Sequence, residues 1–264
     1  MKLLAIDTST DACSAALWLD GEVRQCYQVA PREHGQLILP MIESLLAEAE
    51  LTLVQMDALS FGRGPGGFTG VRIANGVIQG LAFGADLPVV PVSSLAALAQ
   101  GTYVEGYVPV ASGVPPLATL VRRAGCPSAV SAGMRKNRRP CTSRVLAAID
   151  ARIGEVYWGA YRAAENGLMV LVDHEIVCPP QHVPLPDHDL DHDWFGAGSG
   201  WLMYAQQLKT RLGDAVAAWD GQRYPQAQHI AQLGVDAFQR GLAVSAEQAL
   251  PVYLRDEVAW KKSG

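Results

Sequence analysis

The sequence predicts an α/β fold of two related lobes, each with a mixed sheet flanked by helices. Over residues 2–101, strand-like and helix-like segments follow the order β-β-β-α-β-α-β-α, which is typical of a sheet covered by helices on both faces. A similar series starts again near residue 145, as in an internally duplicated protein. The chain has 264 residues, of which 49% are hydrophobic, so it can bury a sizeable core.

In the first series, the apolar segments 2–7, 13–19 and 22–29 are predicted strands. Asp20 and Gly21 are the two-residue turn between the last two, because glycine tolerates the positive φ of a type I′ turn. We expect helices at 36–50, at 69–83 and from Ser93 onward, with strands at 58–62 and 88–92. Pro40 is expected in a first helical turn, where it costs no hydrogen bond, and Gly84 is expected as a C-cap.

The second series repeats the order of elements of the first. The Ala-Ile-Asp at residues 148–150 matches the Ala-Ile-Asp at residues 5–7, so Asp150 corresponds to Asp7. Further strands are predicted within 145–162, 168–177 and 194–200, and helices at 201–212 and 226–240. We therefore divide the chain into an N-terminal lobe (1–101), an insertion (102–143) and a C-terminal lobe with a C-terminal tail (144–264).

The insertion has many prolines and no helix or strand period, so we interpret it as a mobile connection between the lobes. Its basic residues suggest a tRNA-binding arm as the alternative; they are Arg122, Arg123, Arg135, Lys136, Arg138 and Arg139.

Composition narrows the class of protein further. The net charge of −5 argues against a surface built throughout for nucleic acid. The five cysteines contain no C-x-x-C pair, so neither a disulfide framework nor a zinc knuckle is indicated. Asp7 interrupts the first apolar stretch too early for a signal peptide, and no apolar run is long enough to span a bilayer. We expect a cytoplasmic protein without membrane contact.

Glycine-rich loops are the candidates for binding phosphate. Residues 61–70 read Phe-Gly-Arg-Gly-Pro-Gly-Gly-Phe-Thr-Gly and precede a predicted helix, which is the arrangement of an anion cradle. The candidate nucleotide or phosphate contacts are Asp7, Ser9, Gly64, Gly66 and Gly67. Asp7 could instead cap its own turn through Asx hydrogen bonds. The glycines at 196, 198 and 200 resemble a second nucleotide loop, although a tight turn before Trp201 also explains them.

A metal site is conceivable around His182, His188 and His192, which lie among four aspartates. The nearby prolines and acids favour a solvated acidic loop instead. No serine, histidine and acid form a recognisable nucleophile motif.

Two predicted helices carry features that suit a partner. In the helix at 36–50, Leu37, Met41 and Leu45 form one of two apolar rows, which is more than one sheet face requires. The next helix places Gly76 and Gly80 on one face, and each interior glycine costs about 1 kcal/mol relative to alanine. Close approach of another helix would offset that cost, and this helix could belong to the same chain or to another.

Several segments together resemble the bacterial TsaB (YeaZ) family. They are Leu-Ala-Ile-Asp-Thr-Ser-Thr-Asp-Ala-Cys-Ser at 4–14, the glycine-rich segment at 62–73, Val-Pro-Val-Ser-Ser-Leu-Ala-Ala-Leu-Ala at 90–99, Ala-Ile-Asp-Ala-Arg-Ile-Gly-Glu-Val-Tyr at 148–157 and Pro-Val-Tyr-Leu-Arg-Asp at 251–256. The resemblance covers nearly all of the chain except about residues 102–143, where the family has a short connection. It implies a two-lobed actin/sugar-kinase/Hsp70-like (ribonuclease H-like) α/β fold.

The resemblance also implies a role in forming N6-threonylcarbamoyladenosine at position 37 of ANN-decoding tRNAs. In that system the catalytic paralogue is TsaD, and an ATPase called TsaE joins the complex. The resemblance implies that tRNA is contacted indirectly, through the complex. ATP or ADP at a shared interface and a homodimer are further implications. By this resemblance the partner interface comprises Leu37, Met41, Leu45, Arg72, Asn75, Gly76, Gln79 and Gly80.

The paralogue binds a metal through two histidines about one helical turn apart, after its equivalent of the strand at 88–92. Here that place reads Ser-Ser-Leu-Ala-Ala-Leu at 93–98, without a metal ligand of that kind. We therefore expect no catalytic and no metal-binding residues, and a scaffold that activates a threonylcarbamoyltransferase. The alternatives are a free-standing ATP-dependent phosphotransferase, which Ser9 disfavours because a glycine usually stands there, and a metallopeptidase, which the missing histidines disfavour.

Overall fold

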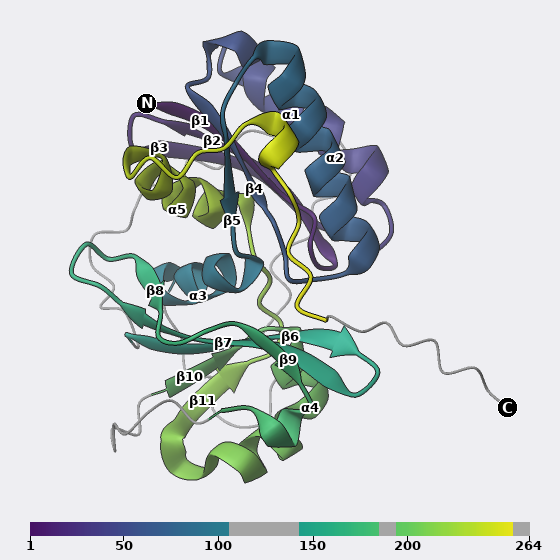
Figure 1. Cartoon of the computed structure of the whole chain (residues 1–264), viewed down its shortest axis with the longest axis vertical. Helices are drawn as coiled ribbons and strands as arrows, with labels where there is room; N and C mark the ends of the chain where they lie inside the picture. Colours follow the sequence, from purple (N-terminus) through teal and green to yellow (C-terminus); the bar gives the residue numbers. More distant parts are fainter. Residues whose placement is uncertain (106–142, 185–193, 256–264) are drawn as a thin grey trace, which may run out of the picture.

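Two sheets lie one above the other with a helix between them (Figure 1). The structure is a computed structural model that describes residues 1–105, 143–184 and 194–255. The predicted basic arm and the predicted ligands His188 and His192 lie outside these residues. So does most of the predicted insertion, although helix α3 (Ser94–Glu105) continues into its first residues. The α/β fold class with two helix-flanked mixed sheets is confirmed.

The first sheet has the strand order β3-β2-β1-β4-β5. Its strands are β1 (Lys2–Asp7), β2 (Ala12–Leu19), β3 (Glu22–Val29), β4 (Ala58–Gly62) and β5 (Val89–Val92). The first three are antiparallel, whereas β4 runs parallel to β1 and β5 parallel to β4. The predicted hairpin is confirmed, because Leu19 faces Glu22 across a turn in which Asp20 and Gly21 have φ of 51° and 103°.

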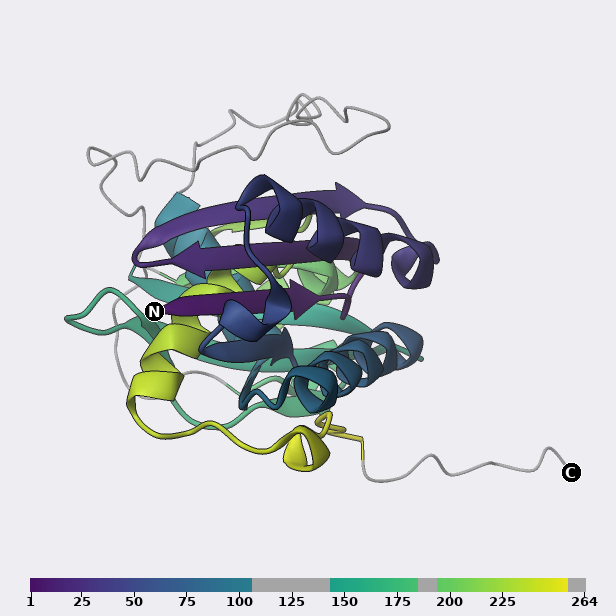
Figure 2. The ribbon, with the colours of Figure 1, turned by 90° about the horizontal axis from the view of Figure 1, so that it is seen from above.

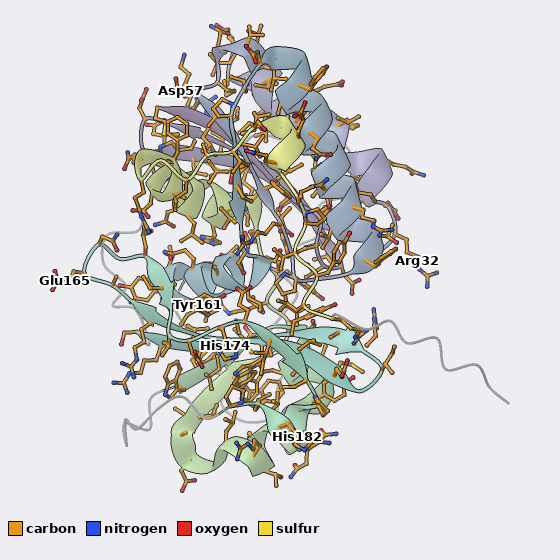
Figure 3. All side chains as sticks on the ribbon, viewed as in Figure 1. Arg32, Asp57, Tyr161, Glu165, His174 and His182 are labelled. Atoms are coloured by element: carbon orange, nitrogen blue, oxygen red, sulfur yellow. The ribbon has the colours of Figure 1, made fainter. Side chains whose placement is uncertain are left out.

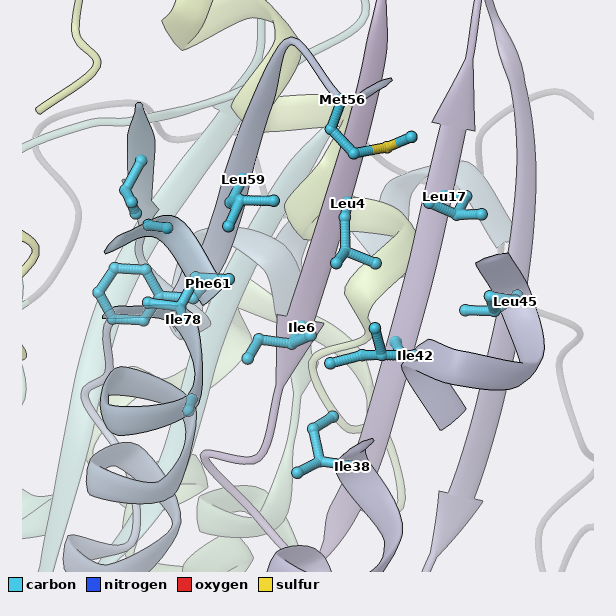
Figure 4. Close-up of a cluster of buried hydrophobic side chains, with 14 of the residues drawn as sticks. Leu4, Ile6, Leu17, Ile38, Ile42, Leu45, Met56, Leu59, Phe61 and Ile78 are labelled. Carbon is cyan, nitrogen blue, oxygen red and sulfur yellow. The ribbon is translucent and has the colours of Figure 1, made fainter. Parts of the chain in front are cut away.

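Alternation along β1 separates the two cores of this sheet. Leu4 and Ile6 point toward helices α1 (His34–Glu48) and α2 (Phe68–Ala85), with which they form one buried cluster (Figure 4). Leu3 and Ala5 point to the other face, where helix α5 (Ala227–Gln239) covers them. The sheet is therefore buried on both faces, as the order of elements predicts.

The helix boundaries differ from the sequence prediction in two informative places. Helix α1 begins at His34, so Pro40 lies in its second turn and removes a hydrogen bond there. Helix α2 ends at Ala85, and Asp86 takes the left-handed conformation with φ of 52°. Gly84 is therefore not the C-cap, because an aspartate accepts the left-handed position that glycine usually fills.

The second sheet has the strand order β11-β10-β6-β7-β8, and β9 pairs with β7. Its strands are β6 (Arg144–Arg152), β7 (Glu155–Ala163), β8 (Met169–Leu171), β9 (Ile176–Cys178), β10 (Trp194–Ala197) and β11 (Val216–Asp220). Helix α3 packs on one face through Leu95, Leu98 and Ala99, and helix α4 (Ser199–Leu212) packs on the other through Trp201 and Leu208. The predicted strand at 168–177 is two short strands, and β11 was not predicted.

The end of the described chain returns to the first sheet. Helix α5 follows the second lobe in sequence but packs against β1, β2 and β4. From there the chain passes beside α2 and runs toward the second lobe (Figures 1 and 2). We call residues Ala249–Arg255 the strap. Short 3-10 turns complete the fold at Leu53–Gln55, Pro180–His182, Gly213–Ala215 and Ala246–Gln248. None of the helices in this described part is long and apolar enough to cross a membrane.

Candidate functional site

The β1–β2 turn and the glycine-rich loop pack directly into each other. A Cβ atom added to Gly66 would lie 2.3 Å from the Ser9 carbonyl oxygen, and the Gly67 N–H donates to that oxygen over 2.7 Å. One turn into α2, a Cβ atom on Gly70 would lie 1.9 Å from the Thr8 carbonyl oxygen. These glycines are required because their own chain approaches them closely.

This packing gives Gly66 and Gly67 a structural role that is an alternative to a phosphate cradle. A cradle needs N–H groups that point toward an incoming anion, whereas the Gly67 N–H already binds Ser9. Gly64 has φ of 95°, a conformation that favours glycine, and its carbonyl accepts the Ser94 N–H over 2.9 Å. The loop thus connects β4, α2 and α3 within one lobe.

Asp7 lies at the centre of this junction and is fully buried. Its Oδ1 accepts hydrogen bonds from the Ser9 N–H over 3.0 Å and from the Ser9 hydroxyl over 2.9 Å, which is the Asx turn given as the alternative to nucleotide binding. Burial raises the pKa of Asp7 from 3.8 to about 7, against the opposing effect of the hydrogen bonds from Ser9 and Ser94. Neither Asp7 nor Ser9 has exposed surface for a ligand in this arrangement.

The glycines of the second lobe are explained in the same way. A Cβ atom on Gly198 would lie 2.4 Å from the Ala148 carbonyl oxygen, and one on Gly196 would lie 2.3 Å from the Trp201 ring. The tight-turn interpretation therefore accounts for this loop without a nucleotide. Asp150 accepts the Arg152 N–H over 2.9 Å, as Asp7 accepts that of Ser9, so the two lobes share this local geometry.

The place of the paralogue's histidines is the start of α3. The Ser93 hydroxyl accepts the N–H groups of Leu95 and Ala96 over 3.1 and 3.2 Å, so it caps the helix. It also donates to Glu175, which receives the hydroxyl of the buried Tyr161 as well. Tyr161 lies beside α3 at the junction of the lobes (Figure 3). These residues join the two lobes, and the side chains at 93–98 do not fit a metal ion.

Within the ranges 1–105, 143–184 and 194–255, no three His, Cys, Asp or Glu side chains gather as a metal site. Of the predicted histidine cluster, only His182 falls in these ranges, and it is exposed in a 3-10 turn beside α4 (Figure 3).

The exposed side of α2 is the most unusual surface of the described chain. Its exposed row runs at intervals of four residues: Phe68, Arg72, Gly76, Gly80 and Gly84. A Cβ atom on any of the three glycines would meet nothing within 4 Å. Phe83, beside the end of the row, is 79% exposed, and Arg72 is the only ionisable residue in the helix. A surface helix normally presents a charged face to water, so this face lacks the usual features of a solvated one.

The remaining predicted partner residues lie deeper. Leu45 has no exposed surface and belongs to the core of the first sheet, so it is not available to a partner. Leu37 and Met41 are half-buried against that core. Asn75 is half-buried as well, and Gln79 donates from Nε2 to the Ala249 carbonyl over 3.0 Å, so it binds the strap. The buried residues of α1 are His34, Ile38, Ile42 and Leu45, whereas Leu39 is exposed.

The contact between α2 and the strap was not predicted from the sequence. The Arg72 guanidinium lies 3.6 Å from the centroid of the Phe68 ring, and its Nε donates to the Tyr253 hydroxyl over 3.0 Å. Phe68 and Tyr253 are 61% and 48% exposed. The spacing of Phe68 and Arg72 was a visible signal, because residues four apart lie on one helix face. Nothing local in the sequence indicates that Tyr253 joins them.

Known proteins with similar sequences share one pathway, the formation of threonylcarbamoyladenosine in tRNA. Residues 28–125 match the family model described as TsaD, tRNA N6-adenosine threonylcarbamoyltransferase. The chain is 40% identical over 263 residues to the tRNA threonylcarbamoyladenosine biosynthesis protein TsaB of Escherichia coli K12, with 99% of this chain and 98% of that protein covered. The protein of the same name from Haemophilus influenzae is 36% identical over 271 residues, with 99% and 97% covered.

A solved structure supports the same assignment. The structure titled YeaZ from Pseudomonas aeruginosa superposes with a TM-score of 0.77 at 44% identity, and the match covers 96% of this chain and 99% of that one. The resemblance stated from the sequence is thereby confirmed: this chain belongs to the TsaB (YeaZ) family of tRNA threonylcarbamoyladenosine biosynthesis proteins.

Proposed function

We propose that this chain is a partner subunit without its own catalytic centre, which binds a TsaD-like threonylcarbamoyltransferase during formation of N6-threonylcarbamoyladenosine in tRNA. The observation that carries the proposal is the exposed glycine row of α2. Interior glycines destabilise a helix, and here no group of the described chain uses the space they leave. Close approach of a helix from another chain would use it.

The match of residues 28–125 to the TsaD family model supports this choice of partner. That range includes α1 and α2, so the partner has a related segment of its own. Two related helices with complementary faces can pack as a small bundle. Further proposed partners are a TsaE-like ATPase and a second copy of this chain. We propose that tRNA is contacted through the complex and that the protein is located in the cytoplasm.

The arrangement of the loops gives little support to an independent phosphotransferase. Such an enzyme needs open N–H groups for phosphate and an accessible carboxylate. In the first lobe, Ser9 occupies the glycine loop and Asp7 is buried. Scaffold function is therefore the interpretation that fits the described residues best.

The test is co-purification with the TsaD-like subunit of the same cell, followed by a tRNA modification assay. Replacement Gly80→Trp places a bulky side chain in the open row, so we expect loss of association and of modification. The protein should remain folded, because the new side chain does not touch the core. An unchanged circular dichroism spectrum would confirm this. The matched control is Val170→Trp, at an exposed position on β8 in the other lobe.

Two results would reject the proposal. One is modification of tRNA by the purified chain alone. The other is failure of the wild-type chain to associate with the TsaD-like subunit. Association of the Gly80→Trp protein at the level of the wild type would instead show that the interface lies elsewhere than the glycine row.

A further inference from the structure

The strap ties α2 to the second lobe along its whole length. Gln79 of α2 binds the Ala249 carbonyl over 3.0 Å, and the Val252 N–H donates to the Arg63 carbonyl over 2.8 Å. At its end, the Arg255 guanidinium donates to the Ala151 carbonyl over 3.1 Å and also pairs with Glu155. The strap is thus held at both ends, and Tyr253 lies between these contacts. Figures 1 and 2 show the strap running from beside α2 toward the second lobe.

Tyr253 and Phe68 hold Arg72 in one orientation. The guanidinium carbon of Arg72 lies 3.6 Å from the Phe68 centroid and 5.8 Å from the Tyr253 centroid, and the two ring centroids are 6.4 Å apart. The hydrogen bond to the Tyr253 hydroxyl engages Nε, one of the five N–H donors of an arginine. Long side chains normally lose rotamer freedom on binding, so an arginine that is already oriented loses less.

The charge of this cluster points to the kind of group that binds there. Arg72 is the only ionisable residue of α2, and it lies in the same row as Gly76 and Gly80. A helix packed against those glycines would remove water from Arg72 as well. A desolvated guanidinium is costly unless an anionic acceptor pairs with it, and its planar N–H groups match a carboxylate.

We propose that α2 and the strap form one composite surface, in which Arg72, oriented by Tyr253 and Phe68, pairs with a carboxylate of the TsaD-like partner. This inference rests on the proposed function. It extends that function by making the C-terminal strap part of the recognition surface and by assigning specificity to one charged pair. Arginine and tyrosine are, with tryptophan, the residue types most enriched among those that dominate binding energy at interfaces.

The test measures the dissociation constant of the full chain with the purified TsaD-like subunit, at low and at high ionic strength. We expect Arg72→Gln to weaken binding about tenfold, as for a central interface residue, and to reduce its dependence on salt. Arg72→Glu should bind more weakly than Arg72→Gln, because it places like charges together. Tyr253→Phe removes only the hydroxyl, and we expect a loss of about threefold, in the range of one hydrogen bond.

Matched controls remove the same groups elsewhere on the surface. Arg240→Gln deletes an exposed arginine of the α5 C-terminus, and Tyr27→Phe deletes a hydroxyl on β3. Both proteins should bind as the wild type does, and the thermal unfolding of all variants should confirm that they are folded.

The reference variant Gly80→Trp distinguishes this inference from the proposed function. Wild-type affinity for Arg72→Gln and Tyr253→Phe, together with loss of binding for Gly80→Trp, would overturn the composite surface and leave the scaffold function intact. Equal affinity of Arg72→Glu and Arg72→Gln would overturn the carboxylate. Unchanged binding of Gly80→Trp would overturn the interface on α2, and the composite surface with it.

Discussion

The carboxyl group of Asp7 lies where three segments of the first lobe meet. Its Oδ1 binds Ser9 in the β1–β2 turn, and its Oδ2 approaches both Gly62 at the end of β4 and the Ser94 hydroxyl at the start of α3, the latter over 3.4 Å. Because burial raises its pKa to about 7, the folded protein binds the Asp7 proton more tightly than the unfolded chain does. The stability of the fold therefore depends on the ionisation of this residue.

We predict that Asp7→Asn removes a pH dependence of stability. A carboxyl whose pKa is raised on folding favours the folded state least when it is ionised, so its contribution falls as the pH rises from about 4 to 7. The asparagine stays neutral and keeps an oxygen for the Ser9 N–H. The variant should therefore gain stability relative to the wild type as the pH rises, by an amount bounded at about 4 kcal/mol for a pKa moved from 3.8 to about 7.

Denaturant unfolding at several pH values between 4 and 8 measures this difference, since its midpoint reports stability. A difference between the two proteins that does not grow with pH would contradict a buried, proton-binding Asp7. Glu33→Gln, which removes an exposed carboxylate before α1, is measured in parallel for comparison.

At the scale of elements, α2 combines two kinds of glycine. Gly70 lies where the β1–β2 turn touches the helix, whereas Gly76 and Gly80 face open space. The first kind is needed by the fold and the second is not. Sequence spacing showed that Gly76 and Gly80 share a face but left open which helix packs against them. In the structure, a Cβ atom added to either glycine would meet no atom of the described chain within 4 Å.

We predict opposite effects of alanine at these positions on the isolated protein. Gly80→Ala should raise the free energy of unfolding by roughly 0.5–1 kcal/mol, because alanine favours the helix and its methyl group meets no other atom. Gly70→Ala should lower it by about 1–3 kcal/mol, because the methyl group would lie 1.9 Å from the Thr8 carbonyl oxygen. Equilibrium unfolding in urea measures both.

The same Gly80→Ala protein should associate less well with the TsaD-like subunit, although it is more stable. Such a trade-off is expected where a residue is kept for binding at the expense of stability. If Gly80→Ala destabilised the isolated protein, the helix would have a packing partner at this position.

At the scale of the whole molecule, the chain closes on itself through α3 and α5. Helix α3 contributes to the cores of both sheets, and Glu105 at its end accepts hydrogen bonds from Arg223 and Gln226, just before α5, each over 3.1 Å. Helix α5 then covers the face of the first sheet that carries Leu3 and Ala5. The first lobe is therefore completed by residues that follow the second lobe in sequence.

We predict that a fragment of residues 1–105 does not form a stable lobe. Without α5, the face of the sheet that meets Ile230 and Val235 would be open to water. The fragment should bind a hydrophobic dye and unfold without a cooperative transition, and a peptide of residues 224–255 should restore cooperativity. A sharp unfolding transition of the fragment alone, without dye binding, would show that this lobe is independent of α5.

Local pattern determined much of this protein. The strand at 2–7, the Asp20-Gly21 turn and the strand at 58–62 follow from the preferences of neighbouring residues, and all three are present in the fold. The family resemblance rested on such local segments as well. Helix ends were less predictable, because Asp86 and Pro40 occupy positions that local rules assign to other residues.

Only the tertiary structure decided what the glycines and the partner residues do. Gly66 packs against Ser9, whereas Gly80 faces open space. The difference depends on which distant segment lies opposite each glycine. Likewise, Leu45 is buried while Arg72 is exposed and held by Tyr253, a contact between residues 181 positions apart. A sequence specifies the preferences of each segment directly, whereas contacts between distant segments form only when the whole chain folds.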